Sequence, residues 1–215
     1  MLYLINFKTY SNGTGTNALR LANTIAGIIQ STNADIIPIV QPTDISAVSK
    51  ITPVISQVID PISYGAHTGQ ILPQAVKDAG AIGTLINHSE KKISLKDIEL
   101  CINLAKHIGL KTVVCASDIK ESMEIAKFKP DYIAFEDPEL IGTGRSVSKT
   151  KPDLVRRFVE VLEEIAPEVI PLCGAGISNR EDVLAAKELG AKGVLVASAI
   201  VEAENPKEAL ANLII

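Results

Sequence analysis

The feature that most constrains the fold is a regular alternation of short apolar runs with longer segments along the 215 residues. The apolar runs have the length of buried strands, and each is followed by a segment long enough for a helix. Strands that alternate with helices pair in parallel through right-handed crossovers. The eight runs are Leu2–Phe7, Ile36–Val40, Val54–Ile59, Ile82–Asn87, Thr112–Ala116, Tyr132–Glu136, Val169–Cys173 and Gly193–Ala197.

Eight such units, with no linker, low-complexity tract or change in composition between them, predict one α/β domain over residues 1–215. The most economical architecture is a closed (β/α)8 barrel, and a doubly wound open sheet is the alternative. Pro38 and Pro171 fall inside two expected strands, where each removes a hydrogen-bond donor from the ladder. Both strands are kept in the prediction because Ile and Val residues flank these prolines.

Several of the intervening segments carry helical periodicity and helix-start signals. Ser94, with Asp97 three residues later, predicts the start of a helix that stops at Gly109. Pro152 suits the first turn of another helix, and Ser178–Glu181 has the pattern of a capping box. The expected buried faces are Leu21, Ile25, Ile28 and Ile29; Ile98, Cys101, Ile102 and Ala105; and Val155, Phe158, Val159 and Leu162.

Composition narrows the class of protein and its partners. Apolar residues make up 47% of the chain and the net charge is −4, so neither nucleic acid nor an anionic membrane is an expected partner. No apolar run approaches the length of a membrane span, and Met1–Ile5 is too short for a signal sequence. Cys101, Cys115 and Cys173 are odd in number and lack Cys-x-x-Cys spacing, which predicts reduced thiols in a cytoplasmic protein.

The first candidate site lies where the sixth apolar run ends. In a (β/α)8 barrel, catalytic residues lie at the carboxyl ends of the strands and in the loops that follow. The run ends at Glu136, and the following segment contains Gly142 and Gly144, whose backbone freedom suits a loop that closes over a ligand. We interpret Tyr132–Gly144 as a rigidly mounted base with a lid attached. An ordinary strand-to-helix loop is the alternative.

Other strand ends bring an ammonium, an imidazole and two small-residue loops to the same face. Asn6 and Lys8 lie at the end of the first apolar run, and His88 directly follows the fourth run. Each of these alone has an ordinary explanation, as a solvated charge or a helix cap. The last two loops offer backbone N–H groups that can bind phosphate, and no cluster of His, Asp and Glu has metal-site spacing, so no metal is expected. These loops contain Gly174, Gly176, Ala197 and Ser198.

Together and in this order, the motifs resemble those of the triosephosphate isomerase family over essentially the full chain, and most closely its short archaeal members. The chain departs from the family pattern at Asp137, where proline is usual, and its lid lacks the usual tryptophan. Cys173–Gly176 replaces a Tyr-Gly-Gly run, and Ala197-Ser198 replaces a Gly-Gly pair. The motifs that carry the resemblance are Asn6-Phe7-Lys8, Gly65-Ala66-His67-Thr68-Gly69, Asn87-His88-Ser89-Glu90, Phe135-Glu136 and Ile141-Gly142-Thr143-Gly144.

The resemblance implies the chemistry of the site. The family interconverts dihydroxyacetone phosphate and D-glyceraldehyde 3-phosphate by proton transfer through an enediolate, in glycolysis and gluconeogenesis, without a cofactor. It implies that Glu136 abstracts the proton next to the carbonyl and that His88 polarises the carbonyl as a neutral imidazole at the start of a helix. Lys8 would stabilise the developing oxyanion, and Asn6 would orient the substrate. The implied phosphate-binding residues are Ile141, Gly142, Gly174, Gly176, Ala197 and Ser198, and the implied supporting residues are Glu90 and Ser89.

The resemblance also implies self-association, as a dimer at least and as a tetramer in the archaeal manner. Family members contact a neighbouring subunit through the loop that corresponds to Gly65–Gly69. The interval between Cys115 and Glu136 is short, so the fifth helix is expected to be abbreviated. Its apolar residues would then be left for a second interface. These residues are Ile119, Met123 and Phe128.

Two other functions remain as alternatives for this pattern. Another phosphate-binding barrel enzyme, such as a sugar-phosphate epimerase, would keep the loops after the seventh and eighth strands. It would not need Asn6 and Lys8 together with His88 and Glu136. A non-catalytic barrel that binds a phosphate ligand is the second alternative, and it leaves the base, the electrophile and the lid unexplained.

Overall fold

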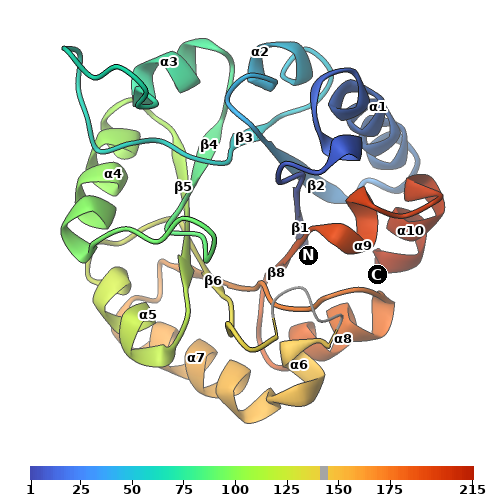
Figure 1. Ribbon diagram of the computed structural model, residues 1–215. Helices are drawn as coiled ribbons and strands as arrows, with labels where there is room; N and C mark the ends of the chain where they lie inside the picture. The colour runs from blue at the N-terminus through green and yellow to red at the C-terminus, as the bar shows by residue number, and fades with distance from the viewer. Residues whose placement is uncertain (141–144) are drawn as a thin grey trace.

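The computed structural model describes residues 1–140 and 145–215, and within them eight parallel strands close into a barrel (Figure 1). The strands follow one another around the barrel in chain order, and β1 pairs with both β2 and β8. The strands are β1 (Leu2–Asn6), β2 (Asp35–Val40), β3 (Ile55–Ser56), β4 (Gly83–Ile86), β5 (Lys111–Ala116), β6 (Tyr132–Phe135), β7 (Ile170–Cys173) and β8 (Gly193–Val196). The predicted (β/α)8 architecture is therefore confirmed.

Helices form a ring outside the barrel (Figure 1), and they are very unequal in length. The short fifth helix that the sequence predicted is present, with eight residues. No helix in the described part of the chain combines the length and hydropathy that a membrane span requires. The helices are α1 (Gly15–Thr32), α2 (Ile45–Val48), α3 (Pro73–Asp78), α4 (Leu95–His107), α5 (Ile119–Ala126), α6 (Val147–Thr150), α7 (Pro152–Ile165), α8 (Arg180–Glu188), α9 (Ser198–Val201) and α10 (Pro206–Leu213), with a 3-10 turn η1 (Ser11–Gly13).

The core has two layers because successive side chains of a strand point to opposite faces. In β1, Leu4 belongs to the cluster inside the barrel, whereas Tyr3 and Ile5 belong to the cluster between the barrel and the helices. Burying each such aliphatic side chain contributes about 1.5–3 kcal/mol. The interior cluster consists of Leu2, Leu4, Ile39, Ile55, Leu85, Val113, Cys115, Ala134, Leu172 and Leu195.

The two prolines that the sequence places inside strands lie where a ladder has not yet begun. The carbonyl of Pro171 accepts a hydrogen bond from Lys192, so this residue faces β8, but the pairing of β7 with β8 starts one residue later, at Leu172. Pro38 faces β3 in the same way. Val40, two residues further along β2, has its backbone groups on the same side as Pro38, and its carbonyl accepts a hydrogen bond from the backbone N–H of Gln57, directly after β3. Pairing of β2 with β3 starts at residue 39. Neither proline therefore removes a ladder donor that a partner needs.

Most of the predicted helix starts are where the sequence indicated, with one shift. Ser94 is the N-cap of α4 and accepts a hydrogen bond from the Asp97 backbone, and Pro152 lies in the first turn of α7. The capping box predicted over Ser178–Glu181 is wrong by one residue. The box is formed by Asn179 and Asp182, because the Asp182 carboxylate accepts from the Asn179 backbone and also from Ser178.

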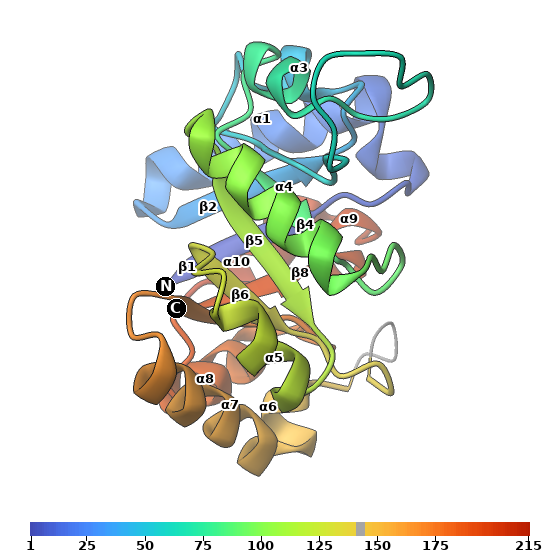
Figure 2. The ribbon, with the colours of Figure 1, turned by 90° about the vertical axis from the view of Figure 1, so that its left-hand side faces the viewer.

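The parallel strands bring their carboxyl ends to one end of the barrel, and both chain ends lie at the other (Figure 2). At that opposite end the Tyr3 hydroxyl accepts a hydrogen bond from the Ile215 backbone at 2.9 Å. The loops that follow the carboxyl ends are long enough to surround a pocket, and this is the end at which (β/α)8 enzymes place their catalytic residues.

Candidate active site

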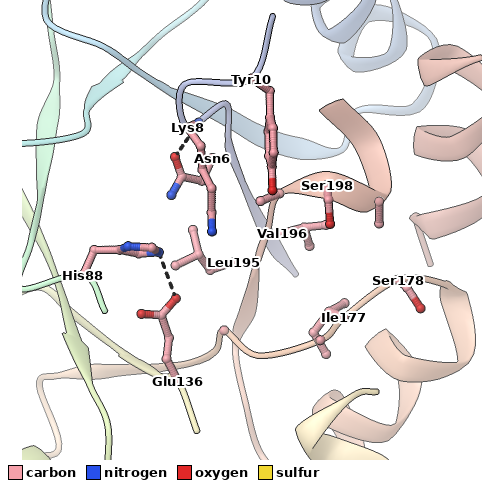
Figure 3. A pocket seen from close by; sticks show the side chains of 14 residues that line it. Asn6, Lys8, Tyr10, His88, Glu136, Ile177, Ser178, Leu195, Val196 and Ser198 are labelled. Atoms are coloured by element: carbon pink, nitrogen blue, oxygen red, sulfur yellow. Dashed lines mark hydrogen bonds and ion pairs between the residues drawn. The ribbon is translucent and has the colours of Figure 1, made fainter. Parts of the chain in front are cut away.

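A pocket of about 270 Å³ opens at the carboxyl ends of the strands. It lies between β1, β4 and β6 on one side and the loops after β7 and β8 on the other (Figure 3). Its lining residues are Asn6, Lys8, Tyr10, His88, Glu136, Gly174, Gly176, Ile177, Ser178, Leu195, Val196, Ala197, Ser198 and Ala199. Eight of the sequence-predicted site residues therefore meet in one place, although they come from five different strand ends.

Glu136 and His88 point toward one another across one side of the pocket (Figure 3). Glu136 Oε1 lies 3.4 Å from His88 Nε2, and the two side chains are 4% and 10% exposed. His88 Nδ1 accepts a hydrogen bond from the backbone N–H of Glu90 at 3.2 Å. A backbone N–H can only donate, so the neutral ring carries its proton on Nε2, the nitrogen that faces the carboxylate.

The expectation that a helix begins at His88 is wrong. Only a single turn forms there, closed by the bond from the Lys91 backbone to the His88 carbonyl, and α4 begins at Leu95. The chain between the turn and the helix is held by Asn87, whose side chain accepts from the Ile93 backbone. Side-chain contacts around Asn87, rather than a helix terminus, therefore fix the position of the imidazole.

Lys8 enters the pocket from the end of β1 in a constrained backbone conformation. Its φ is +46°, in the left-handed region that few non-glycine residues adopt. The Asn6 side chain accepts from the Lys8 N–H at 3.0 Å, and the Gln57 amide donates to the Lys8 carbonyl at 2.8 Å. The Lys8 ammonium lies 2.8 Å from Glu90 Oε1. Asn6 and Glu90 thus hold the only pocket-lining ammonium among the described residues.

Two buried oxygen atoms at the site have no hydrogen-bond partner among the described residues. They are Glu136 Oε2 and Ser89 Oγ. Leaving a buried polar atom unpaired costs free energy, so Glu136 Oε2, whose residue lines the pocket, is available to a ligand there. Behind Glu136 lies Cys115; burial, and then the charge of Glu136 and a hydrogen bond to it, raise the pKa of this thiol well above its usual range.

The predicted phosphate-side residues form the opposite wall of the pocket. Gly176 has φ +69°, and a Cβ there would overlap the backbone carbonyl of Arg145, so only glycine fits. Ala197 precedes the single turn of α9, which begins at Ser198. The first N–H groups of such a turn have no partner within the turn itself. The chain after Gly174 and Ala197 therefore presents small residues and backbone donors to the pocket.

Two predicted phosphate-binding residues, Ile141 and Gly142, lie outside the described residues, as do Thr143 and Gly144 of the expected lid. The chain before this segment is anchored at Asp137, the residue at which the family pattern has proline. Asp137 Oδ2 lies 2.8 Å from Lys151 Nζ, and its other oxygen accepts from the Glu139 backbone. The ion pair between Asp137 and Lys151 thus holds the chain at the position where the family's usual proline would restrict the backbone.

Sequence reasoning missed several residues that contact the site. Tyr10, Ile177, Ser178 and Ala199 line the pocket, and each follows a predicted strand end by only a few residues. Gln57 follows β3 directly, but the predicted run Val54–Ile59 placed it inside a strand rather than at a strand end. No group of three His, Cys, Asp or Glu residues suited to a metal ion occurs within residues 1–140 and 145–215.

Comparisons with known proteins point in the same direction over nearly the whole chain. The sequence model of a family described as triosephosphate isomerase matches residues 1–214. A triosephosphate isomerase of Methanobacterium bryantii is 47% identical over 215 residues, which cover 99% of this chain and 95% of that protein. One of Methanocaldococcus jannaschii is 47% identical, with coverage of 100% and 99%. One of Methanosarcina barkeri is 44% identical, with coverage of 98% and 96%.

Proposed function

Since the chain belongs to the triosephosphate isomerase family, and so interconverts dihydroxyacetone phosphate and D-glyceraldehyde 3-phosphate through an enediolate, we propose that Glu136 and His88 carry out the proton transfer. The observation that carries this proposal is the 3.4 Å approach of Glu136 Oε1 to His88 Nε2 in a buried pocket. The similarities favour neither another phosphate-binding barrel enzyme nor a non-catalytic barrel. The reaction belongs to glycolysis and gluconeogenesis.

In the proposed mechanism, Glu136 abstracts a proton from the carbon next to the substrate carbonyl. The electron pair of the broken C–H bond moves to the carbonyl oxygen and gives an enediolate. His88, with its proton on Nε2, donates a hydrogen bond to the substrate oxygen on which this charge develops. The hydroxyl proton on the adjacent oxygen is then transferred to the charged oxygen, for which His88 Nε2 is the proposed carrier. Glu136 returns its proton to the former carbonyl carbon, and the new carbonyl forms at the carbon that was first deprotonated, which completes the aldose–ketose exchange. Burial supports these roles because a pocket that excludes water protects the enediolate from side reactions and strengthens the electrostatic interactions made with it.

Lys8 and the small-residue loops are proposed to bind the charged parts of the substrate. The Lys8 ammonium would offset the charge of the enediolate, and Asn6 would keep Lys8 in its left-handed conformation. Gly174, Gly176, Ala197 and Ser198, with Ile141 and Gly142, would bind the phosphate, mainly through backbone N–H groups. Glu90 would hold Lys8, with which it forms a 2.8 Å ion pair. Ser89 would support the loop that carries the neighbouring His88.

The test is a coupled assay of dihydroxyacetone phosphate isomerisation by Glu136→Gln and His88→Gln. Each variant roughly keeps the size of the side chain. Glu136→Gln removes the base, and His88→Gln replaces the imidazole with an amide that can donate a hydrogen bond but cannot transfer a proton. We expect kcat to fall by at least about 100-fold in each, the contribution typical of a positioned acid or base, while the far-UV circular dichroism is unchanged. A chelator should not alter the wild-type rate. Near-wild-type turnover in either variant would refute its assigned role.

We further propose that residues 1–215 act as one catalytic domain in an oligomer, a dimer at least. The loop after β3 projects beyond α3 at the edge of the barrel (Figure 1), and Gly65–Gly69 is fully exposed next to Tyr64, which is 75% exposed. Asp60 holds the base of the loop by bonds to Ile71 and Lys91. A loop so anchored is suited to dock on a second copy of the chain.

A hollow of about 150 Å³ beside the active site is the proposed place where a neighbour's loop would dock. It is lined in part by Lys8, Thr9 and Glu90, so the loop would cover the outer side of the lysine. A tetramer is proposed through α4 and α5, where Leu95, Leu100 and Met123 are about 40% exposed. Ile119 and Phe128 are half-buried and would lie at its margin.

We propose that the enzyme works in the cytoplasm. Cys101, Cys115 and Cys173 are buried thiols outside any disulfide, and burial, with the charge of Asp182 adding to it, raises the pKa of Cys173 to about 12. Such inert thiols are usual in proteins of a reducing compartment. Localisation of a fluorescent fusion, or fractionation of the cells that make the protein, tests this proposal.

A further inference from the structure

A cluster of polar side chains lies behind the active site, at the end of β5, the strand between those that carry His88 and Glu136. Its centre is Asn87, which immediately precedes His88, is 3% exposed and has φ +59°. The Asn87 Nδ2 group donates to the Cys115 carbonyl at 2.8 Å and to Glu121 Oε1 at 3.0 Å. Asn87 Oδ1 accepts from the Ile93 backbone. All the hydrogen-bonding atoms of this amide are therefore used to hold the loop that carries the imidazole.

Glu121, in the first turn of α5, is the anchor of this cluster. Its Oε1 accepts from Asn87 and from Lys92 Nζ at 2.6 Å, and its Oε2 accepts from both the backbone and the hydroxyl of Ser117, at 2.7 and 2.6 Å. Burial alone would raise the pKa of this carboxyl, but the hydrogen bonds from Lys92, Ser117 and Asn87 outweigh it and lower the pKa to about 2. Glu121 is therefore a fixed anion at neutral pH.

The cluster connects the electrophile and the base to one strand end. The Cys115 carbonyl of β5 accepts from Asn87, and the next carbonyl, that of Ala116, accepts from the Glu136 backbone at 2.8 Å. Ser117, which follows Ala116, donates hydrogen bonds from its backbone N–H and its hydroxyl to Glu121. The relative position of His88 and Glu136 thus depends on the last two residues of β5, on Ser117 directly after them, and on the side chains that hold Asn87 against this strand end.

We propose that Glu121 is a positioning residue for the isomerase reaction, which acts through Asn87 to hold His88 Nε2 in line with Glu136 and the substrate oxygen. This inference rests on the proposed roles of His88 and Glu136. Glu121 touches neither the pocket nor the substrate and is not a catalytic residue. The backbone of Asn87 is in the left-handed region, which asparagine adopts more readily than most residues. Glu121 holds the Asn87 side chain in the rotamer that supports the loop.

Replacement of Glu121 by glutamine tests the idea with little change in volume. Glutamine has one oxygen and one NH₂ group in place of two oxygens. Whichever way the amide is turned, the NH₂ group faces either Asn87 and Lys92 or the Ser117 N–H, so one set of donors loses its acceptor. We expect kcat to fall by about 10- to 100-fold, as when a reacting group is misplaced by up to about 1 Å. KM for dihydroxyacetone phosphate should stay unchanged because the phosphate-side loops are distant.

Glu124→Gln is the matched control. It removes the same charge from the same helix and breaks the ion pair with Lys127, but within residues 1–140 and 145–215 no hydrogen bond or ion pair joins Glu124 to Asn87. Its kcat should equal that of the wild type. If Glu121→Gln does not fold, Lys92→Met replaces it, because the Lys92 side chain is 40% exposed and gives Glu121 Oε1 one of its two donors. It should lower kcat in the same direction, by a smaller factor.

A double-mutant cycle separates positioning through Asn87 from a merely structural role in capping α5. Asn87→Gly removes the amide but keeps a residue that tolerates positive φ. If Glu121 acts through Asn87, Glu121→Gln should lower kcat in the wild type but have no further effect on kcat in Asn87→Gly. Additive effects, or a kcat for Glu121→Gln equal to that of Glu124→Gln, would overturn the proposal.

The same assay distinguishes failure of this inference from failure of the proposed function. Glu136→Gln is measured in parallel. If Glu136→Gln is inactive while Glu121→Gln keeps wild-type kcat, only the positioning role is overturned. If Glu136→Gln keeps wild-type kcat, the base is wrongly assigned and the positioning role falls with it.

Discussion

At the scale of single residues, the geometry of the base depends on a neighbour without a side chain. Gly174, at the end of β7, donates its N–H to the Phe135 carbonyl, one residue before Glu136. A Cβ at Gly174 would lie 2.8 Å from Glu136 Cγ, closer than such atoms can approach. The glycine thereby allows the carboxylate to turn toward His88. Residue 174 thus affects the base as well as any phosphate that its loop binds.

Gly174→Ala should therefore lower kcat by about tenfold or more, because a displacement of the base well below 1 Å already slows proton transfer. The control is Gly27→Ala on the exposed face of α1, where a Cβ would meet nothing within 4 Å. That change should leave kcat unaltered and raise the free energy of unfolding by about 0.5–1 kcal/mol, since alanine favours the helix. Steady-state kinetics and urea unfolding measure both. Equal kcat values for the two variants would contradict the close contact with Glu136.

At the scale of elements, the amino ends of the strands hold a different charged site, which serves stability. Asp131, before β6, accepts from Lys111 Nζ at 2.6 Å and from the backbone and hydroxyl of Thr112 in β5. Its carbonyl accepts from Ile170 at the start of β7. Partial burial alone would raise the pKa of Asp131, but the bonds from Lys111 and Thr112 outweigh it and lower the pKa.

This shift predicts a defined dependence of stability on pH. Because the folded pKa of Asp131 is below its unfolded value, the unfolded state binds more protons between the two values, and stability rises with pH there. The contribution is present above the unfolded pKa of about 3.9 and is lost as pH falls through the folded pKa. Asp131→Asn should cost about 1–3 kcal/mol at neutral pH and flatten the acid limb of the stability curve. Urea unfolding at several pH values checks this, with Asp153→Asn, an exposed change on α7, as control. If the stability of Asp131→Asn falls at acid pH as steeply as that of the wild type, the proposed role of Asp131 is contradicted.

The sequence predicts the elements well where local chemistry decides them. Each of the eight predicted apolar runs contains a strand, although the third strand is only Ile55–Ser56 within the predicted Val54–Ile59. The cap of α4 needs only Ser94 and Asp97. The prediction fails at His88, where a helix was expected and a turn forms. That turn depends on Asn87 and on Glu121, 34 residues further along the chain, and periodicity carries no information about such a bond. The shift of the α8 cap has a local cause. The Asp182 carboxylate accepts hydrogen bonds from both Ser178 and Asn179, and the box forms at Asn179, one residue after the predicted position.

The site shows the same division between short-range and long-range information. Eight pocket residues were predictable because they follow strand ends, and parallel strands place those ends together. Gln57 was missed because the apolar run Val54–Ile59 extends past it, whereas the strand itself ends at Ser56. Glu121 was not found because it binds the site from behind, through Asn87. A residue that acts through another has no signature at the pocket itself.

At the scale of the whole molecule, the proposed interfaces predict separable assembly states. Thr68→Glu puts a charge at the tip of the exposed loop Gly65–Gly69 and should yield monomers with lowered kcat, because the neighbour's loop no longer packs beside Lys8. Met123→Glu should yield dimers of normal kcat. Asn212→Glu, on the exposed surface of α10, is the control and should leave the assembly unchanged. Sedimentation equilibrium with activity on the same samples decides; a fully active wild-type monomer would refute the assembly proposal.

The most direct test of the central claim, that Glu136 transfers the proton, is the conversion of D-glyceraldehyde 3-phosphate in D₂O followed by proton NMR. A proton held by a carboxylate exchanges with solvent before it is returned, so the wild-type enzyme should place deuterium on carbon in the dihydroxyacetone phosphate product. Glu136→Gln, with native circular dichroism, should incorporate deuterium no faster than the uncatalysed reaction. Incorporation by Glu136→Gln at the wild-type rate would mean that another group is the base and would contradict the account.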